Sequence, residues 1–373
     1  MKQFKAGAYI NQGHYKSFQP EFIDKQWILE DMEIIQLLSK ADRHIGRLDM
    51  YSEHIPDIDI FISMHVLKEA TQSSKIEGTQ TNMEEALLNK EDVSNEKKDD
   101  WEEVQNYIEA MNTSIQMLKE LPVSSRLIKE AHKILLQGVR GKNKLPGVFR
   151  TSQNWIGGAS IADATFIPPI HNSINNLMGD LEKFAHSTEY FPDLLKIAII
   201  HYQFETIHPF LDGNGRVGRL LITLYLVDKK ILKQPILYLS DFFERNKELY
   251  YSNLMNARLN NNITQWLKFF LVGVIETAEK GVETFNSILK LKTTTELEIQ
   301  SLGTRANNAQ KIIQYLFKHP MIDVSKIVST TGVSKRTAYN LIDDLERINI
   351  LKEITGSKRD KLYIFNNYMN LFR

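Results

Sequence analysis

Two strongly apolar segments separated by a short glycine-rich turn constrain this chain more than any other feature. Residues 194–207 and 216–227 are mostly apolar, and Gly213 and Gly215 lie between them. A helix that is apolar on all sides is buried in a protein core. Both segments therefore predict helices at the centre of a helical fold. Neither is long enough to span a bilayer, so we expect no membrane contact.

Most of the remaining sequence also predicts helix. Apolar residues recur at three- and four-residue spacing in residues 28–47 and 101–118, and another helix is expected at about residues 58–78. Residues 145–170 differ, because paired proline and glycine residues interrupt them in three places, and they predict a β-hairpin. The expected fold class is mostly α, with one hairpin.

The C-terminal residues 309–373 show another pattern. Three short helices are expected, with Gly332 where a helix-turn-helix needs its turn and Ser334 capping the third helix. An alternating stretch with Gly356 in its middle predicts a two-stranded wing. We expect a winged-helix module here, a polar linker at residues 284–308, a central domain at residues 111–283 and a helical N-terminal region at residues 1–110.

Charge and cysteine content exclude several classes of protein. Lys+Arg and Asp+Glu both number 46, so no net charge attracts the whole chain to nucleic acid. The sequence has no cysteine, which excludes disulfides, a thiol nucleophile and Cys-ligated zinc. Residues 1–12 lack a signal-peptide pattern. These features favour a soluble cytoplasmic protein.

The turn between the two apolar helices contains the residues with the most evident chemistry. It reads His208-Pro209-Phe210-Leu211-Asp212-Gly213-Asn214-Gly215-Arg216-Val217-Gly218-Arg219. Pro209 should end the preceding helix at His208, and Asp212 offers the kind of oxygen ligand that Mg²⁺ prefers. The amides that open the next helix form an anion site, and Arg216 and Arg219 project from one side of its first turn. Together these groups predict phosphate-transfer chemistry.

This turn resembles the signature of the Fic family, His-x-Phe-x-(Asp/Glu)-Gly-Asn-Gly-Arg-x-x-Arg, at every specified position. Residues 145–170 resemble the family's flap, which pairs with an extended segment of a target protein. Residues 240–251 resemble the region that closes over the nucleotide. The resemblance, over residues 20–280, implies a protein adenylyltransferase that moves AMP from ATP to a Ser, Thr or Tyr hydroxyl of a target protein or of itself.

The resemblance also implies a role for individual residues. His208 would be the general base that takes the hydroxyl proton, and Asp212 would hold Mg²⁺ on the phosphates of ATP. Nucleotide or phosphate contacts are implied for eight further residues: Gly213, Asn214, Gly215, Arg216, Arg219, Arg245, Tyr250 and Tyr251. Arg219 among them would bind the γ-phosphate.

A second resemblance lies upstream, at the end of the helix expected at residues 58–78. Ser73, Glu77 and Gly78 match the family's inhibitory motif, (Ser/Thr)-x-x-x-Glu-(Gly/Asn), in the position typical of its N-terminally inhibited class. The resemblance implies that Glu77 pairs with Arg219 and occupies the guanidinium that the γ-phosphate needs. Without the resemblance, this segment predicts only a helix end, with Gly78 following it.

Alternative roles for the residues around the turn remain open at this stage. His201, Glu205 and His208 fall on one helical face at a spacing that can hold zinc. Glu77 could also position a water that removes AMP from a modified protein. A homodimer is a further option, as in many relatives.

The C-terminal module leaves a different class of function open, a DNA-binding regulator whose Fic part senses nucleotide or modifies the module. Lys335 and Arg336 begin the expected recognition helix, which favours nucleic-acid contact. The wing adds further basic residues: Lys352, Lys358, Arg359 and Lys361. Nearby acidic residues nearly cancel this charge, so protein contact through residues 309–373 is the other option.

Overall fold

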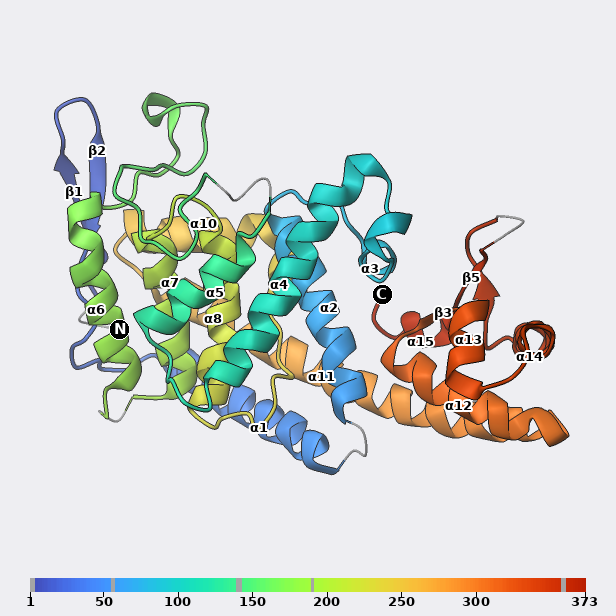
Figure 1. Cartoon of the computed structure of the whole chain (residues 1–373). Helices are drawn as coiled ribbons and strands as arrows, with labels where there is room; N and C mark the ends of the chain where they lie inside the picture. Colours follow the sequence, from blue (N-terminus) through green and yellow to red (C-terminus); the bar gives the residue numbers. More distant parts are fainter. Residues whose placement is uncertain (1–3, 55–57, 139–142, 189–190, 357–359) are drawn as a thin grey trace. The chain divides into compact units, whose positions relative to one another are not determined.

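The computed structural model describes residues 4–54, 58–138, 143–188, 191–356 and 360–373. Its internal contacts divide the chain into two compact units. Unit 1 consists of Met1–Ser52 and Val66–Glu279, and unit 2 consists of Glu53–His65 and Lys280–Arg373. Both are mostly helical (Figure 1), which confirms the expected fold class. No described helix has the length and apolar character needed to cross a membrane.

Unit 1 holds two short strands and most of the helices. Its elements in chain order are β1 (Gly7–Asn11), β2 (Lys16–Pro20), α1 (Met32–His54), α2 (Ile58–Ile76), α3 (Met83–Ala86), α4 (Lys98–Met117), α5 (Ser125–Leu135), α6 (Ile174–His186), α7 (Asp193–Ile207), α8 (Asn214–Asp228), α9 (Ser240–Arg245), α10 (Lys247–Leu259) and α11 (Thr264–Gln300). Three of them, α1, α2 and α11, extend into unit 2.

The two helices predicted from the apolar segments, α7 and α8, form the centre of unit 1. Every residue of α7 from Leu194 to Ile207 is buried, as is most of α8. The two helices contact each other, α6 packs on α7, and α4 and α5 pack on α8 (Figure 1). A helix that is apolar on all sides avoids contact with water only when a core surrounds it, so both helices are buried.

The strands of unit 1 differ from the sequence prediction in two ways. β1 and β2 form an antiparallel hairpin within the N-terminal region that we expected to be helical. Short strands around a turn at Gly13, whose φ is +91°, give too few alternating residues to be recognised. The predicted hairpin at residues 145–170 is reduced to one antiparallel bridge, between Ile156 and Phe166. Its prolines supply no N–H donors for a longer ladder.

The residues predicted to form a polar linker, 284–308, are largely helical. Helix α11 continues through the three threonines at 293–295 as far as Gln300. A threonine lowers helix propensity by only a few tenths of a kcal/mol, about 0.7 at most, whereas Phe285 and Ile299 gain by being buried. Burial on this helix therefore outweighs the local preference of the polar stretch.

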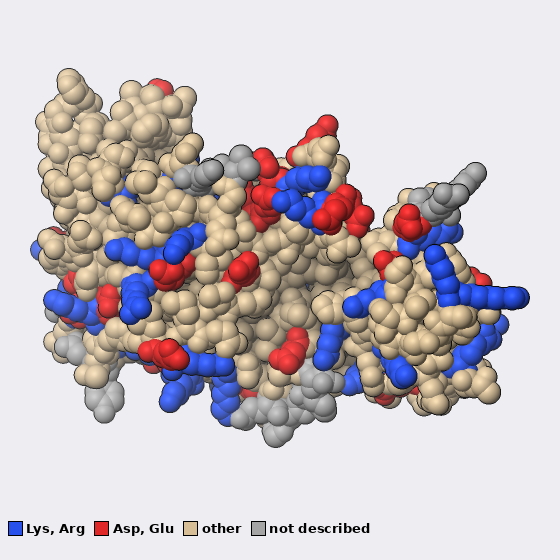
Figure 2. Space-filling model, viewed as in Figure 1, with Lys and Arg blue, Asp and Glu red and all other residues tan. Residues whose placement is uncertain are grey.

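Unit 2 contains the expected three helices, a small sheet and one further short helix at its C-terminal end. Its elements are α12 (Ala306–Lys318), β3 (Met321–Asp323), α13 (Val324–Thr331), α14 (Lys335–Arg347), β4 (Lys352–Glu353), β5 (Leu362–Ile364) and α15 (Asn366–Met369). The antiparallel sheet has the order β3-β5-β4. Gly332 (φ +76°) ends α13, and the Ser334 hydroxyl accepts a hydrogen bond from the Thr337 N–H to cap α14. The visible face of this unit is mostly covered by uncharged residues, with scattered Lys and Arg side chains and fewer acidic ones (Figure 2). Lys358 and Arg359 lie outside the described residues.

Candidate active site

The turn from α7 to α8 begins with a histidine in an unusual backbone conformation. α7 ends at Ile207, as Pro209 predicted, and His208 adopts φ +51° and ψ +60°. A left-handed non-glycine residue costs on the order of 1–3 kcal/mol. The cost is offset at the carbonyl of His208, which accepts hydrogen bonds from Arg150 Nε (2.9 Å) and Asn154 Nδ2 (3.3 Å).

The imidazole of His208 is in the form that accepts a proton. Burial, reinforced by the charges of Arg150 and Arg258, lowers its pKa to about 3, so the ring is neutral at neutral pH. Its Nδ1 is buried and has no hydrogen-bond partner among the described residues. A nearby polyphosphate would raise the pKa again, because negative charge stabilises an imidazolium. His208 can therefore serve as a general base once an anionic substrate is bound.

Asp212 is the one carboxylate of the turn, and its side chain is 46% exposed. Its Oδ1 accepts a hydrogen bond from the Gly213 N–H (2.6 Å) and lies 3.9 Å from the Arg216 guanidinium. A solitary, accessible carboxylate fits Mg²⁺, which proteins often hold through one or two carboxylates while substrate phosphates and waters complete the octahedron.

The zinc alternative is not supported. Among the described residues, no group of three or more His, Cys, Asp or Glu side chains is placed to hold a metal ion. His201 uses both ring nitrogens elsewhere, with Nδ1 2.9 Å from the Gly218 carbonyl and Nε2 2.8 Å from the Tyr250 hydroxyl. It is a hydrogen-bonded core histidine.

The N-terminus of α8 is open to an anion. Gly213 precedes the helix with φ +73° and provides no side-chain cap, so the first-turn amides have no side-chain acceptor. Asn214 closes the turn with its side chain instead: Oδ1 accepts from the Phe210 N–H (2.8 Å) and Nδ2 donates to the Phe210 carbonyl (2.9 Å). The signature asparagine thus fixes the shape of the turn.

The two signature arginines are almost fully buried but have different partners. Arg216 pairs with Glu103 on α4 (3.2 Å) and more distantly with Asp212. Arg219 donates from Nε to the Ser73 hydroxyl (2.8 Å), and from Nη2 to the Ser73 carbonyl (2.8 Å) and to Glu77 Oε1 (2.7 Å). The predicted contact between the inhibitory segment and Arg219 is present, and Ser73 is part of it.

Glu77 follows the end of α2 and reaches the first turn of α8. Burial alone would raise its pKa, but the charge and hydrogen bond of Arg219 outweigh this, so the pKa is lowered and Glu77 is an anion. A Cβ atom on Gly215 would lie 2.2 Å from Glu77 Oε1. Only glycine at position 215 lets the carboxylate come so close, and the carboxylate lies at the helix terminus that would attract a phosphate.

The residues predicted to close over the nucleotide are placed differently from one another. Arg245 forms ion pairs with Asp241 (3.4 Å) and Glu276 (3.8 Å) on the surface of unit 1. Tyr250 is 1% exposed, and its hydroxyl forms a hydrogen bond with His201 Nε2, so Tyr250 cannot contact a ligand in this conformation. Tyr251 is 42% exposed, and burial of its hydroxyl followed by the Glu77 charge raises its pKa. Tyr251 is therefore the one of the three that is both near the Glu77–Arg219 pair and accessible to a ligand.

Several residues that hold the catalytic turn in place were given no role in the sequence analysis. Arg150 and Asn154 fasten residues 207–210 through backbone carbonyls. His132 on α5 contacts the carbonyl of Asp212 (3.0 Å). Glu69 is buried on α2, two helical turns before Glu77. Its carboxylate accepts hydrogen bonds from the Tyr107 hydroxyl (3.0 Å) and the Ser240 N–H (3.1 Å). Glu69 precedes Ser73 by four residues and Glu77 by eight, which places all three on one helical face. This spacing is the sequence signal that could have identified Glu69.

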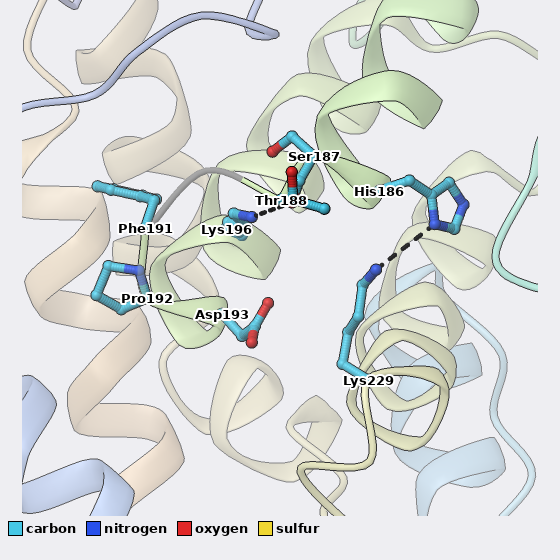
Figure 3. A pocket seen from close by; sticks show the side chains of 8 residues that line it. All are labelled: His186, Ser187, Thr188, Phe191, Pro192, Asp193, Lys196 and Lys229. Atoms are coloured by element: carbon cyan, nitrogen blue, oxygen red, sulfur yellow. Dashed lines mark hydrogen bonds between the residues drawn. The ribbon is translucent and has the colours of Figure 1, made fainter.

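A separate cavity of about 560 Å³ lies near the start of α7 and the end of α8, away from the turn (Figure 3). Its lining residues are His186, Ser187, Thr188, Phe191, Pro192, Asp193, Lys196 and Lys229. Lys196 donates to the Ser187 carbonyl (2.8 Å), and Lys229 approaches His186 Nδ1 (3.5 Å). None of these residues belongs to the signature or to the inhibitory segment.

Comparison with known sequence families and structures identifies the fold and the turn. Residues 35–116 match the "Fic/DOC family N-terminal" model and residues 122–226 match the "Fic/DOC family" model. A Fic family protein from Desulfovibrio desulfuricans has a similar fold, with a TM-score of 0.58 and 19% identity over 91% of this chain and 98% of that one. Fic-1 of Caenorhabditis elegans gives a TM-score of 0.51 with 18% identity, over 69% of this chain and 74% of that one. The chain belongs to the Fic/DOC family.

Two curated relatives are similar over shorter stretches. A probable protein adenylyltransferase of Aquifex aeolicus is 28% identical over 190 residues, which is 49% of this chain and 54% of that protein. Protein adenylyltransferase Fic of Aedes aegypti is 36% identical over 83 residues, 22% of this chain and 15% of that protein. The matches thus span about half of the bacterial relative and a small part of the insect one.

Proposed function

We propose that this protein is an adenylyltransferase that moves AMP from ATP to a Ser, Thr or Tyr hydroxyl of a target protein or of itself. The observation that carries the proposal is the arrangement of the turn: an unprotonated His208 beside the uncapped N-terminus of α8 and two buried arginines. The names of the Aquifex and Aedes relatives support AMP as the transferred group.

In the proposed reaction, His208 takes the proton of the target hydroxyl as its oxygen attacks the α-phosphorus. The bond from the α-phosphorus to the bridging oxygen breaks, and pyrophosphate leaves. The amides of Gly213, just before α8, and of Asn214 and Gly215 in its first turn bind phosphate oxygens and stabilise the developing charge. Arg216 and Arg219 add charge-assisted hydrogen bonds. Bound Mg²⁺, held by Asp212, would neutralise the phosphates and orient them.

We further propose that Glu77 inhibits this reaction within the same chain. Its carboxylate pairs with Arg219 at 2.7 Å and lies against Gly215, where the γ-phosphate is expected. With this position filled, ATP binds with its α-phosphorus out of line with the attacking hydroxyl. A misplacement of about 1 Å can cost on the order of a hundredfold in rate. The same carboxylate could instead orient a water that removes AMP, which is the minor alternative.

The target protein is proposed to bind along the flap, residues 145–170. The described flap has one internal bridge, so most of its backbone groups are not committed to a ladder. An extended segment can add to such a backbone as a further strand. Trp155 in this segment is 41% exposed and can contact a side chain of the target.

For residues 309–373 we propose a winged-helix module with a second function, contact with DNA or with a protein. The order α12-β3-α13-α14-β4-β5 and the Gly332 turn support the winged-helix assignment. Lys335, Arg336 and Tyr339 are exposed at the start of α14, and scattered Lys and Arg side chains are visible on the surface of unit 2 (Figure 2). A shift of labelled duplex DNA by residues 1–373, lost on Lys335→Glu with Arg336→Glu, would favour DNA over protein.

The test of the proposed activity is label transfer from α-³²P-ATP with Mg²⁺ to the protein itself and to a cell lysate. Wild type, Glu77→Gly and Glu77→Gly with His208→Ala are compared. Label should appear with Glu77→Gly and fall by about 10²–10⁴-fold when His208 is also replaced. Transfer at full rate without His208 would refute the mechanism. Release of label from a pre-modified protein by wild type, and not by Glu77→Gly, would favour AMP removal.

A further inference from the structure

A buried side chain that belongs to neither the flap nor the signature touches both of them. His132 on α5 has no exposed surface. The Gly147 N–H at the start of the flap donates to its Nδ1 at 2.9 Å, and its Nε2 lies 3.0 Å from the Asp212 carbonyl oxygen. Its ring stacks on Phe210, with 3.7 Å between ring centroids and 8° between planes. No other role of the site uses this histidine.

These contacts fix the tautomer of His132. A backbone N–H can only donate, so Nδ1 carries no proton and accepts from Gly147. Nε2 must then carry the proton of the neutral ring and donate it to the Asp212 carbonyl. One imidazole therefore forms a directed bridge from the flap to the turn.

The flap approaches α5 as closely as its backbone allows. Gly147 has φ +78°, and a Cβ atom there would lie 3.0 Å from Cβ of Lys133 and 3.2 Å from the Lys129 carbonyl oxygen. On the other side of the ring, Asp212 immediately precedes Gly213 and the open amides of α8. A shift of the His132 ring would therefore move the base of the flap and the first-turn amides together.

We propose that His132 is a positioning residue that couples the base of the flap to the Asp212 end of the catalytic turn. Its loop-side hydrogen bond holds the residue that would bind Mg²⁺, and its flap-side hydrogen bond holds the start of the segment that would bind the target. The proposal rests on the proposed function for its effect on catalysis. Its structural part, the coupling of two segments, stands without it.

Three substitutions separate the two hydrogen bonds. His132→Phe keeps the ring that stacks on Phe210 and removes both bonds. His132→Asn places an amide oxygen near the position of Nδ1, so it can still accept from Gly147 but cannot reach Asp212. His132→Gln places an amide NH₂ near the position of Nε2, so it can still donate to Asp212 and loses the flap. His186→Phe is the control, because it removes a half-buried imidazole that bonds a carbonyl at a distant place, Val123.

Hydrogen exchange of the nucleotide-free protein is the first readout, followed in peptides covering residues 143–153 and 208–216. His132→Phe should speed exchange in both peptides, His132→Asn mainly in the turn and His132→Gln mainly in the flap. His186→Phe should change neither. The second readout is AMP transfer in the Glu77→Gly background. His132→Asn should raise the Mg²⁺ concentration for half-maximal rate and lower that rate, by on the order of tenfold to a hundredfold. His132→Gln should leave the Mg²⁺ requirement unchanged.

Equal effects of His132→Asn and His132→Gln on both peptides would overturn the proposal, because His132 would then be a packing residue. Unchanged exchange in His132→Phe would overturn it as well. If His132→Phe does not fold, the other two variants still decide, since each keeps one hydrogen bond. If no variant transfers AMP, including Glu77→Gly alone, the proposed function fails while the exchange experiment still tests the coupling.

Discussion

The catalytic turn is held on two sides by contacts of opposite character. On the flap side, the Arg150 guanidinium is 2% exposed and donates to the carbonyl oxygens of Ser152, Pro169, Ile207 and His208. On the α2 side, Arg219 meets Glu77, whose side chain is 36% exposed. The flap side uses buried, neutral acceptors, and the α2 side uses a charged acceptor that water can reach.

This difference separates a permanent contact from a releasable one. Breaking the Arg150 contacts leaves buried carbonyls unsatisfied, at a cost of about 1–3 kcal/mol for each group. Releasing Glu77 returns a carboxylate to water and leaves Arg219 free for a phosphate, so a bound triphosphate can replace what is lost. The α2 side is therefore suited to regulation, and the flap side to keeping the strained His208 in place.

The largest effect is expected on the flap side. Arg150→Ala should lower AMP transfer by on the order of a hundredfold, because His208 loses the donor that holds its carbonyl. It should also lower the free energy of unfolding by about 3 kcal/mol. Denaturant unfolding and α-³²P-ATP transfer in the Glu77→Gly background measure both. Arg347→Ala, which removes an arginine whose side chain is 67% exposed, is the control and should change neither. An Arg150→Ala protein of normal stability would remove the distinction between the two sides.

On the α2 side, Glu77→Gly should raise AMP transfer by about tenfold or more, since a preference of about 1.4 kcal/mol already gives a tenfold bias. The free energy of unfolding should change by less than about 1 kcal/mol, because the lost carboxylate is partly exposed. Arg219→Ala should not reproduce the activation, because it also removes the group that binds the γ-phosphate. The comparison fails if Glu77→Gly is as inactive as wild type, or destabilises the protein as much as Arg150→Ala.

Gly215→Ala should show a smaller effect whose sign depends on Glu77. The added methyl group would lie 2.2 Å from Glu77 Oε1 and 2.9 Å from Arg219 Nη1. In wild type it should displace the carboxylate and raise transfer about threefold, less than Glu77→Gly because the methyl group also crowds Arg219. In the Glu77→Gly background the same methyl group should lower transfer. Equal changes in both backgrounds would show that Glu77 does not fill this position.

The sequence predicted the α2 side of the site better than the flap side, for a physical reason. Glu77 and Arg219 pair through their side chains, and the resemblance to the family's inhibitory motif and signature, which are patterns of side chains, implied this pair. Arg150, Asn154 and His132 bind backbone carbonyls, and any residue can supply a carbonyl. Their roles depend on the path of the main chain through the turn. A pattern of residue types does not predict that path.

The same reasoning explains the errors in the fold. The central helices were predictable because burial on all sides requires nearly continuous apolar sequence in α7 and α8. The β1–β2 hairpin is only ten residues in two strands, and its β1 strand is mostly exposed. An exposed strand needs no apolar alternation, so the N-terminal region showed no strand pattern.

A pH dependence of stability distinguishes the α2-side ion pair from the core behind it. Burial lowers the pKa of His201 from its ordinary 6.5 to about 3. Below pH 6.5 the unfolded chain therefore binds a proton that the folded protein excludes, and stability falls as the pH falls. Burial raises the pKa of Glu205 from 4.5 to about 7. Between pH 7 and 4.5 the folded protein binds the extra proton here, so Glu205 adds stability as the pH falls.

Glu205→Gln should expose this balance, because glutamine keeps the size of the protonated carboxyl without its titration. The variant should lose stability more steeply than wild type between pH 7 and pH 5, by about 1 kcal/mol per pH unit. The pKa of Glu77 is lowered, so its pair with Arg219 persists in this range. Because the Glu77 charge also raises the pKa of Glu205, though less than burial does, the stability difference between wild type and Glu77→Gly should change much less between pH 7 and pH 5 than the difference between wild type and Glu205→Gln. Thermal unfolding of the three proteins at both pH values measures this, and a Glu77→Gly difference that vanishes at pH 5 would mean that the α2-side contact is itself the acid-sensitive one.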